Sequence, residues 1–189
     1  MLDIAWISSD KKQDNLYDEL CFDKVFFIES FGENKWGDGV VIEAKTKEDL
    51  MRKIDKIKGK YQFIIVLGGS NEANRNALEN KDIDILLNPE REKEKDFMHY
   101  RNSGLNQVLC KIAKENGKAI GINFSEIKKM KGKKDAEKLG RILQNIRLCK
   151  KYKVPIILAS FAKNAKELVH SAELKSFART LGIDKINEL

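Results

Sequence analysis

The segment IKKMKGKKDAEK gathers five lysines around a single glycine, Gly132. The lysines are Lys128, Lys129, Lys131, Lys133 and Lys134. A flexible glycine turn lets several ammonium groups face one polymer backbone, and lysine binds phosphate as a compact point charge. The segment therefore predicts a phosphate clamp. A solvated loop is an equally good interpretation in the absence of a nucleic acid.

Positive charge is concentrated in one third of the chain. Residues 101–153 hold 15 Lys or Arg and 4 Asp or Glu, a net of +11, whereas the other 136 residues hold 21 basic and 25 acidic side chains, a net of −4. A field of that sign attracts polyanions and speeds their association. Few aromatic residues interleave with the cations, which favours recognition of a phosphate backbone over base stacking. The alternative is a solvated, Lys-rich surface without a partner.

Gly68, Gly69 and Ser70 follow the apolar run FIIVL and precede the helix-like segment NEANRNALEN. Backbone N–H groups at such a turn could hold a phosphate at the start of a helix. A turn whose following helix is capped by Ser70 explains the same residues without a ligand, and we favour it. The segment also lacks the Gly-Lys-Ser/Thr sequence of a nucleotide-binding P-loop.

The chain offers little material for an active site of its own. It has two histidines, His99 and His170, and both lie outside the predicted strands. A metal-dependent hydrolase of the barrel type needs several His, Asp or Glu ligands at strand ends. We therefore predict no catalytic residue, no metal ligand and no bound cofactor, and we expect both histidines at the surface or facing a nucleic acid.

Short β-branched runs alternate with longer amphipathic segments, a pattern typical of βα units and a parallel sheet. The predicted strands are Leu2–Ile7, Lys24–Ile28, Val40–Glu43, Phe63–Leu67, Ile83–Leu86, Ala119–Asn123 and Ile156–Ala159. Runs such as FIIVL and PIIL are apolar on both faces, so helices should cover the sheet. About seven such units favour a TIM-like α/β barrel, whose functional residues follow the carboxyl ends of the strands.

The spacing of apolar residues also places helices. One follows Thr46, a second opens at Ser103 as its N-cap and stops at Gly117, and the longest spans about residues 135–151. The longest helix should present apolar residues to the core on one face and its cations, Arg141 among them, to solvent on the other.

Length and composition indicate one compact domain, residues 1–189. The three cysteines are far apart in sequence and form no Cys-x-x-Cys pair, so they suggest neither a disulfide framework nor a zinc knuckle. No run approaches the roughly 20 apolar residues of a membrane span, and the first residues are unlike a secretion signal. A cytoplasmic protein without membrane contact is expected.

Most of the chain after residue 62 carries motifs that occur together in one protein family. They are Gly68-Gly69, NRNALE at 74–79, DILLNPE at 84–90, RNSGLNQVLCKIAKENG at 101–117, IGINFSEI at 120–127, RLCKKYKVPIILAS at 147–160 and LKSFARTLGI at 174–183. From about Phe63 to Ile183, their order and spacing resemble those of archaeal and eukaryotic ribonuclease P protein component 3.

That resemblance implies a barrel related to triosephosphate isomerase that binds the catalytic part of the ribonuclease P RNA. It also implies pairing with ribonuclease P protein component 2, two copies of each, and assembly with components 1 and 4 and a kink-turn-binding ribosomal protein. The RNA would remove the 5′ leader of precursor tRNA by phosphodiester hydrolysis with Mg²⁺ held largely by RNA. The protein would neutralise phosphates and stabilise the RNA fold, touching precursor tRNA only indirectly.

The side chains expected to bind RNA are Arg91, Arg101, Lys128, Lys129, Lys131, Lys133, Lys134, Arg141, Lys150, Lys163 and Arg179. Of these, Arg91 and Arg101 should lie together in loops at the strand-end face. Both can bind phosphate strongly, because a guanidinium gives phosphate a fork-shaped pair of bonds that lysine cannot reproduce. The partner protein should dock on the first hundred residues, since a surface of +11 makes an expensive interface unless the partner is acidic.

The sequence departs from the family pattern at three places. It has Asn88-Pro89-Glu90 where His-Pro-Glu is usual, Arg101-Asn102-Ser103-Gly104 where Arg-Asp-Ser-Gly is usual, and VHSA at 169–172 where arginines beside a proline are common. The first departure weakens a metal site further. The third removes an expected RNA contact, part of which His170 could supply.

Two other functions stay open on the sequence alone. An independent metal-dependent phosphoesterase would share the barrel ancestry that the resemblance implies. A barrel used only for protein assembly would show no salt-dependent binding of RNA.

Overall fold

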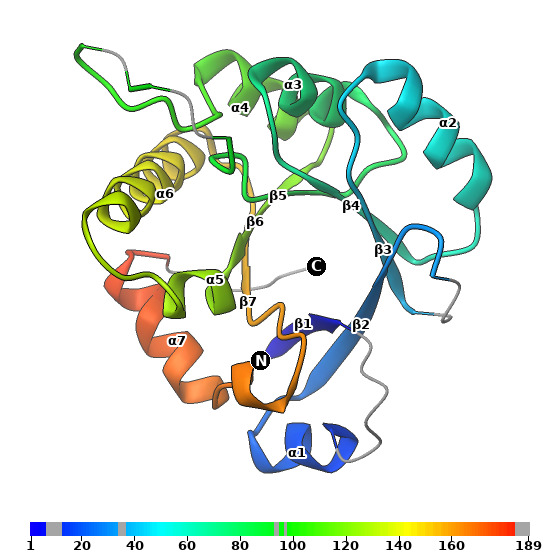
Figure 1. Ribbon diagram of the computed structural model, residues 1–189, viewed down its shortest axis with the longest axis vertical. Coiled ribbons are helices and arrows are strands. Elements are labelled where there is room, and N and C mark those ends of the chain that lie inside the picture. Colours follow the sequence, from blue (N-terminus) through cyan, green and yellow to red (C-terminus); the bar gives the residue numbers. More distant parts are fainter. Residues whose placement is uncertain (7–12, 34–36, 93–94, 97, 184–189) are drawn as a thin grey trace.

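The computed structural model describes residues 1–6, 13–33, 37–92, 95–96 and 98–183; Ile7 and the side chains of 13–15, Lys133 and Lys134 lie outside its described part. Within it, seven strands form one parallel sheet in chain order (Figure 1). They are β1 (Leu2–Trp6), β2 (Lys24–Ser30), β3 (Gly39–Ile42), β4 (Phe63–Leu67), β5 (Ile85–Leu87), β6 (Ala119–Asn123) and β7 (Ile156–Ala159). The predicted strands are confirmed to within two residues at each described end.

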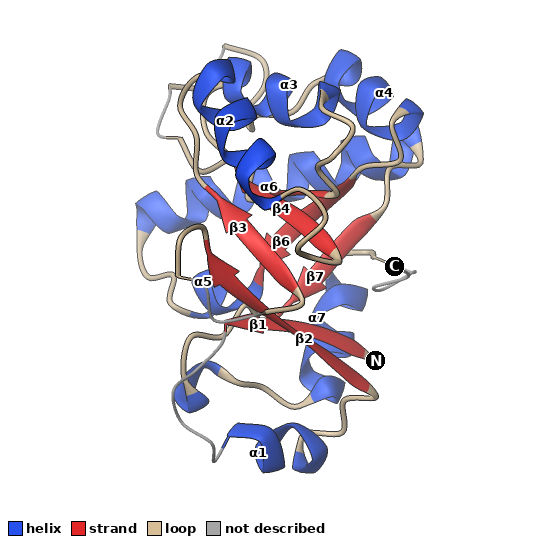
Figure 2. Ribbon diagram, turned by 90° about the vertical axis from the view of Figure 1, so that its right-hand side faces the viewer, coloured by secondary structure: helices blue, strands red, loops and turns tan. Residues whose placement is uncertain are grey.

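Helices surround the ring of strands (Figures 1 and 2). They are α1 (Gln13–Glu19), α2 (Lys47–Ile57), α3 (Asn71–Glu79), α4 (Gln107–Glu115), α5 (Phe124–Lys128), α6 (Lys133–Tyr152) and α7 (Ser171–Thr180), with a 3-10 turn at Ala165–Glu167. The predicted TIM-like barrel is therefore confirmed. Among the described helices, none is both long and apolar enough to cross a membrane.

The seam between the first and last strands is bridged by the segment that follows β7. The N–H of Phe161 donates to the Ile4 carbonyl (2.8 Å), and the N–H of Trp6 donates to the Ala162 carbonyl (2.9 Å). Beside them, the buried Asp3 carboxylate accepts the N–H and the hydroxyl of Ser160 at 2.6 Å each. Burial raises the pKa of Asp3, and the two bonds from Ser160 oppose that rise. These contacts leave the ring nearly closed with seven strands.

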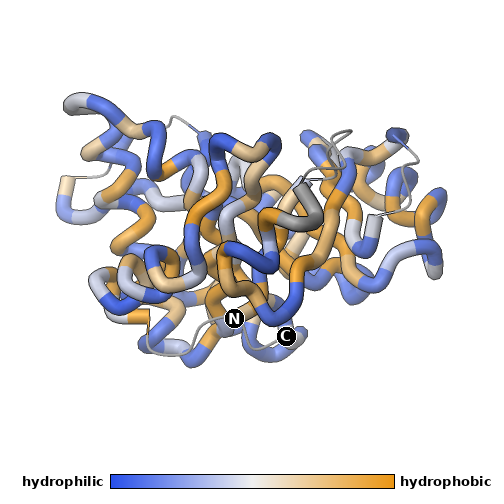
Figure 3. Tube along the Cα trace, turned by 90° about the horizontal axis from the view of Figure 1, so that it is seen from below, coloured by the Kyte–Doolittle hydropathy of each residue, from blue (hydrophilic) through white to orange (hydrophobic). Residues whose placement is uncertain are grey.

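Alternate strand residues fill the inside of the ring with apolar side chains. They are Ile4, Phe26, Ile28, Val41, Phe63, Ile65, Ile85, Leu87, Ala119, Ile157 and Ala159, with Phe161 from the seam. The intervening residues pack outward under the helices, as Val40 and Val66 do under Leu50 and Ile54 of α2. Figure 3 shows hydrophobic residues recurring along the part of the trace that runs through the middle of the molecule. Because the interior is packed, polar groups able to bind a partner are confined to the two ends and the outer surface.

The structure confirms one of the two predicted caps, because Ser70 caps α3. The helix predicted to follow Thr46 is also present, and Thr46 accepts the N–H of Asp49 at the start of α2. The prediction that Ser103 caps the following helix is wrong, because α4 begins at Gln107 and its cap is Asn106, whose side chain accepts two backbone N–H groups. The left-handed turn at Gly104 (φ +75°) separates Ser103 from the helix.

The longest helix, α6, begins two residues earlier than predicted and ends one later. Its predicted apolar face is confirmed, since Ile142, Ile146 and Cys149 are buried. The solvent-exposed position expected for Arg141 is wrong, because this side chain is only 9 % exposed. A loop of the β5–α4 connection pairs with it and covers that side of the helix.

Candidate functional site

The connections that follow β4 and β5 meet at one buried side chain, Asn74 of α3. Its amide nitrogen donates to the carbonyls of Pro89 (3.0 Å) and Gly104 (3.1 Å), and its amide oxygen accepts the N–H of Gly69 (2.9 Å). An asparagine side chain offers both donors and an acceptor, so one residue satisfies three backbone groups. Three motifs that are far apart in sequence are thereby held together.

The turn after β5 depends on Asn88, whose φ of +52° is left-handed. Asparagine tolerates this conformation better than most residues. Its N–H donates to the Gly121 carbonyl (3.0 Å), and its side-chain oxygen accepts the N–H of Asn123 (3.1 Å). The turn is therefore fastened to β6, and Glu90 follows it toward α6.

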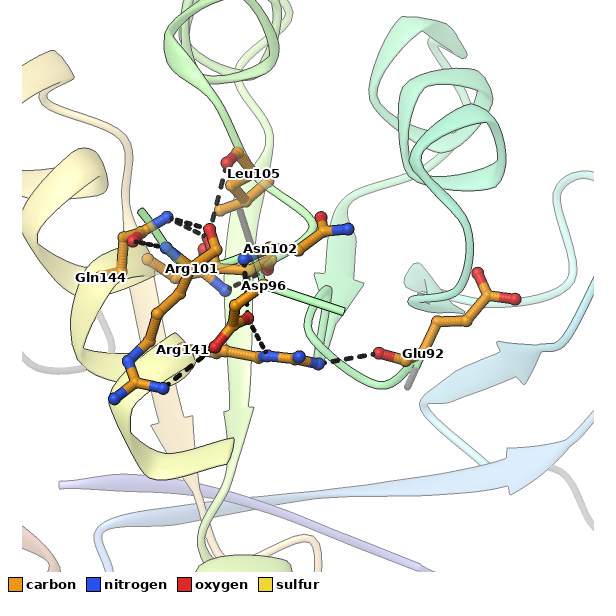
Figure 4. Close-up of polar contacts among 9 residues, drawn as sticks. Glu92, Asp96, Arg101, Asn102, Leu105, Arg141 and Gln144 are labelled. Atoms are coloured by element: carbon orange, nitrogen blue, oxygen red, sulfur yellow. Dashed lines mark hydrogen bonds and ion pairs between the residues drawn. The ribbon is translucent and has the colours of Figure 1, made fainter. Parts of the chain in front are cut away.

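Two adjacent residues of α6, Gln144 and Asn145, bond to the loop that carries Arg101, and Figure 4 shows the contacts of Gln144. The Gln144 side chain accepts the N–H of Arg101 (3.1 Å) and donates to its carbonyl (2.8 Å) and to the Ser103 hydroxyl (2.9 Å). The Asn145 amide donates to the Ser103 carbonyl (2.8 Å) and to Glu90 (3.2 Å). Because both α6 residues bond to the loop, the backbone of Arg101 is placed rigidly above the helix.

Glu90 is a buried carboxyl group, and burial raises its pKa to about 7. The positive charge of Lys138 opposes this rise and the carboxylate of Glu126 adds to it. A perturbed carboxyl at a strand end is a common feature of active sites. Here its hydrogen-bond partner is the amide of Asn145, which supports a role in bracing the loop.

Asp96 holds two arginines of different elements together (Figure 4). Its carboxylate lies 3.1 Å from Arg101 Nη1 and 2.9 Å from Arg141 Nε, and it also accepts the N–H of Asn102 (2.9 Å). Desolvation acts to raise the pKa of Asp96, but the Asn102 N–H and the charge of Arg141 outweigh it and lower that pKa. Arg141 also donates to the Glu92 carbonyl (3.2 Å), so its guanidinium is used within the protein.

A cleft of about 660 Å³ opens at the carboxyl ends of β3 and β4. Arg91 and Glu43 form an ion pair on its wall (2.6 Å). The Gly68 N–H already donates to the Leu87 carbonyl (2.7 Å), and the Gly69 N–H donates to Asn74. Both glycine N–H groups therefore already donate within the protein and are not available to a phosphate. The turn capped by Ser70, which we favoured over a phosphate site, is confirmed.

The predicted RNA-binding cations are divided between the two ends of the barrel. Loops after the strands and the starts of the helices share the carboxyl end, because each helix runs antiparallel to its strand. The cations at that end are Arg91, Arg101, Lys128, Lys129, Lys131, Arg141 and Lys163, with the backbone of Lys133 and Lys134 at the start of α6. Lys150 follows Lys133 by 17 residues in α6, about 25 Å along the axis. Lys150 and Arg179, near the end of α7, therefore lie toward the opposite end.

Several of these cations have partners within the chain. Lys129 pairs with Glu167 (2.6 Å), Lys150 donates to the Gly182 carbonyl (2.6 Å), and Lys163 lies 5.3 Å from the ring centre of Trp6. Exposed ion pairs contribute only about 0–1 kcal/mol, so such a pair can be exchanged for a phosphate at little cost. Lys128, Lys131 and Arg179 are exposed.

Sequence reasoning did not single out the residues that brace this site or a second group of lysines. The bracing residues are Asn74, Asp96, Gln144 and Asn145, whose partners are distant in the chain and leave no local signal. The second group is Lys111, Lys114, Lys151 and Lys153, which line one cleft. The charge count of residues 101–153 includes these lysines, but they lie in two separate segments of the chain and form no local run.

Within the part of the chain that the structure describes, neither histidine lies in a group of potential metal ligands. His170 caps α7 by accepting the N–H of Ala172 at Nδ1 (3.1 Å), and His99 is exposed. Among the described residues, no group of three or more His, Cys, Asp or Glu side chains is placed to hold a metal ion.

Comparison with known proteins identifies relatives of this barrel. The chain matches the family model described as RNase P subunit p30 over residues 7–187. Ribonuclease P protein component 3 of Methanosarcina mazei is 35 % identical over 147 residues, which cover 78 % of this chain and 58 % of that protein. The same component of Methanocaldococcus jannaschii is 29 % identical over 167 residues, covering 87 % and 69 %. The chain thus spans 58–69 % of the length of these two relatives.

One solved structure agrees with this match, and another shares the fold. A chain in the cryo-EM structure of archaeal ribonuclease P with mature tRNA superposes with a TM-score of 0.80 and 26 % identity, covering 96 % of this chain and 82 % of that one. A prolidase superposes with a TM-score of 0.52 and 9 % identity over 76 % of this chain and 38 % of that one, a likeness of fold alone.

Proposed function

The chain belongs to the RNase P subunit p30 family, and on that premise we propose that it is a protein subunit of ribonuclease P that binds and stabilises the catalytic RNA. The observation that carries the proposal is the TM-score of 0.80 with a chain of archaeal ribonuclease P. The holoenzyme removes the 5′ leader of precursor tRNA, and RNA performs the cleavage with Mg²⁺ that it largely holds. The protein's part is to place cations against phosphates.

The braced loop at the carboxyl end of the barrel supplies the principal contact in this proposal. Arg101 keeps 43 % of its side chain exposed while Asp96 and the backbone bonds of Gln144 hold it in place. A preorganised guanidinium gives up little conformational entropy when it binds two phosphate oxygens. To bind Arg101, phosphate has to replace a single exposed ion pair, that with Asp96, and such pairs contribute little free energy.

The partner proteins are proposed on the same grounds. Ribonuclease P protein component 2 docks on the less cationic surface formed by the first hundred residues, with two copies of each chain, and components 1 and 4 and a kink-turn-binding ribosomal protein complete the assembly. The net charge of +11 in residues 101–153 supports this placement, because a protein interface there needs an acidic partner. Crosslinks to component 2 that cluster on residues 128–151 would overturn it.

Two measurements test the central proposal. Purification of the chain from its native host should bring down a structured RNA of the ribonuclease P type. In binding assays with that RNA, log affinity should fall linearly with log salt, and changing Lys133 and Lys134 together to Gln should flatten the slope by up to about two units. A chain that carries no RNA and binds none at low salt is not such a subunit.

A further inference from the structure

A second cationic surface lies between the ends of α4 and α6, beyond the part of α6 that Arg101 contacts. It is a cleft of about 500 Å³ lined by Lys111, Lys114, Glu115, Lys151, Tyr152 and Lys153. The two helices pack against each other (Figure 1), and both run antiparallel to the strands, so their last turns meet. We call this surface the α4–α6 cleft.

Tyr152 at the α4–α6 cleft is held in place by contacts with its neighbours. Tyr152 packs against the apolar cluster beneath α4, and its hydroxyl lies 3.4 Å from the side-chain oxygen of Gln107. The Lys151 ammonium lies 5.6 Å from the centre of the Tyr152 ring. The ring thus lies beside one of the four lysines, and all four are exposed.

The charges of the cleft are not balanced within the protein. Among the described residues, none of its four lysines forms an ion pair, and its one acidic residue is Glu115. The helix C-termini add roughly half a negative charge each, so the cleft keeps a net charge of about +2. If the lysines served only to balance the partial negative charges of the two helix C-termini, fewer of them would be enough. Converging like charges repel one another, and an anionic partner relieves that repulsion.

We propose that the α4–α6 cleft binds the sugar-phosphate backbone of RNA, as a contact separate from the Arg101 loop. This inference rests on the proposed function and adds a second RNA-binding surface to it. Contacts to phosphate and sugar carry no sequence information directly, so this contact is independent of sequence. A protein partner fits less well, because protein interfaces have apolar centres and few lysines, whereas four of the six lining residues here are lysines.

The proposal is tested with the full chain and a transcript of the ribonuclease P RNA from the same genome. The cleft variant changes Lys111, Lys114 and Lys151 to Gln, which keeps helix propensity and removes three charges. The matched control changes the exposed Lys47, Lys56 and Lys60 to Gln, on and beside α2. The measurement is the slope of log affinity against log salt.

The cleft variant should flatten the slope by about two units while the control keeps the wild-type slope. Equal slopes for the cleft variant and the wild type, or equal flattening by both variants, would overturn the inference. Either result leaves the proposed function standing, whereas wild-type protein that does not bind the transcript removes the proposed function itself.

Acetylation of lysines gives a second readout that needs no variant. In the complex with the transcript, Lys111, Lys114 and Lys151 should be protected from acetylation, whereas Lys56 should react as it does in the free chain. Protection that arises only when protein subunits are added, and not with RNA alone, assigns the cleft to a protein and sinks the proposal.

Discussion

The guanidinium of Arg101 lies against the backbone of Gly140 in α6, so that a Cβ at Gly140 would be 2.5 Å from Arg101 Nε and 2.8 Å from Cζ. Glycine inside a helix costs about 1 kcal/mol relative to alanine. In α6 this glycine makes room for the arginine that the family motif and the charge pattern both single out. A side chain of the β5–α4 loop therefore packs directly on the backbone of α6 at Gly140.

Gly140→Ala should displace the Arg101 guanidinium from its position against α6 without changing any charge. We expect RNA affinity to fall roughly fivefold, about 1 kcal/mol. The gain of about 1 kcal/mol in helix propensity offsets the loss of an exposed ion pair, so the melting temperature should move by less than about 4 °C. Fluorescence anisotropy with RNA and thermal melting check the two effects. Unchanged affinity would mean that the position of the guanidinium is immaterial.

Arg101→Lys should weaken RNA binding at moderate salt although the charge is kept, because the ammonium cannot bind two phosphate oxygens as a fork. The salt slope should stay near that of the wild type, since the number of released counterions is the same. Arg75→Lys is the matched control, because Arg75 is an exposed arginine paired with a carboxylate, that of Glu79, on α3. A loss of thermal stability with full affinity would make Arg101 a structural residue instead.

Asn74→Ala should destabilise the fold by about 3 kcal/mol, because the backbone groups of Gly69, Pro89 and Gly104 lose their buried partner. Urea unfolding monitored by circular dichroism measures the change. The exposed Asn71→Ala in the same helix should stay within about 0.5 kcal/mol of the wild type. If Asn74→Ala cost under about 1 kcal/mol, this side chain would not hold the three loops together.

Glu90 should make stability depend on pH. Its pKa rises from 4.5 to about 7 in the folded protein, so the folded state binds the extra proton. The stability it contributes is therefore complete below pH 4.5 and is lost as pH rises through about 7. Glu90→Gln removes this dependence and should be more stable than the wild type at pH 8 by up to about 3 kcal/mol, with a smaller difference at pH 5. Urea titrations at both pH values would reveal a constant difference if the carboxyl did not titrate between them.

Much of the barrel follows from the sequence by itself. Strand positions, the apolar face of α6, the helix start after Thr46 and the Ser70 cap depend on neighbours within a few residues, so periodicity and cap chemistry predict them. The cap predicted at Ser103 is wrong for a reason that the local sequence does not contain. The left-handed turn at Gly104 separates Ser103 from the helix, and the Ser103 hydroxyl accepts a hydrogen bond from Gln144 instead.

The tertiary structure alone decided which cations share a surface. A charge count places +11 in residues 101–153, but Lys133 and Lys150 of α6 lie about 25 Å apart along the helix axis. Arg141 was drawn inward because the carboxylate of Asp96, 45 residues away, lies beside it. Lys111 and Lys151 share one cleft because α4 and α6 pack side by side. Such pairings depend on how helices pack around the ring, and spacing along the chain does not encode them.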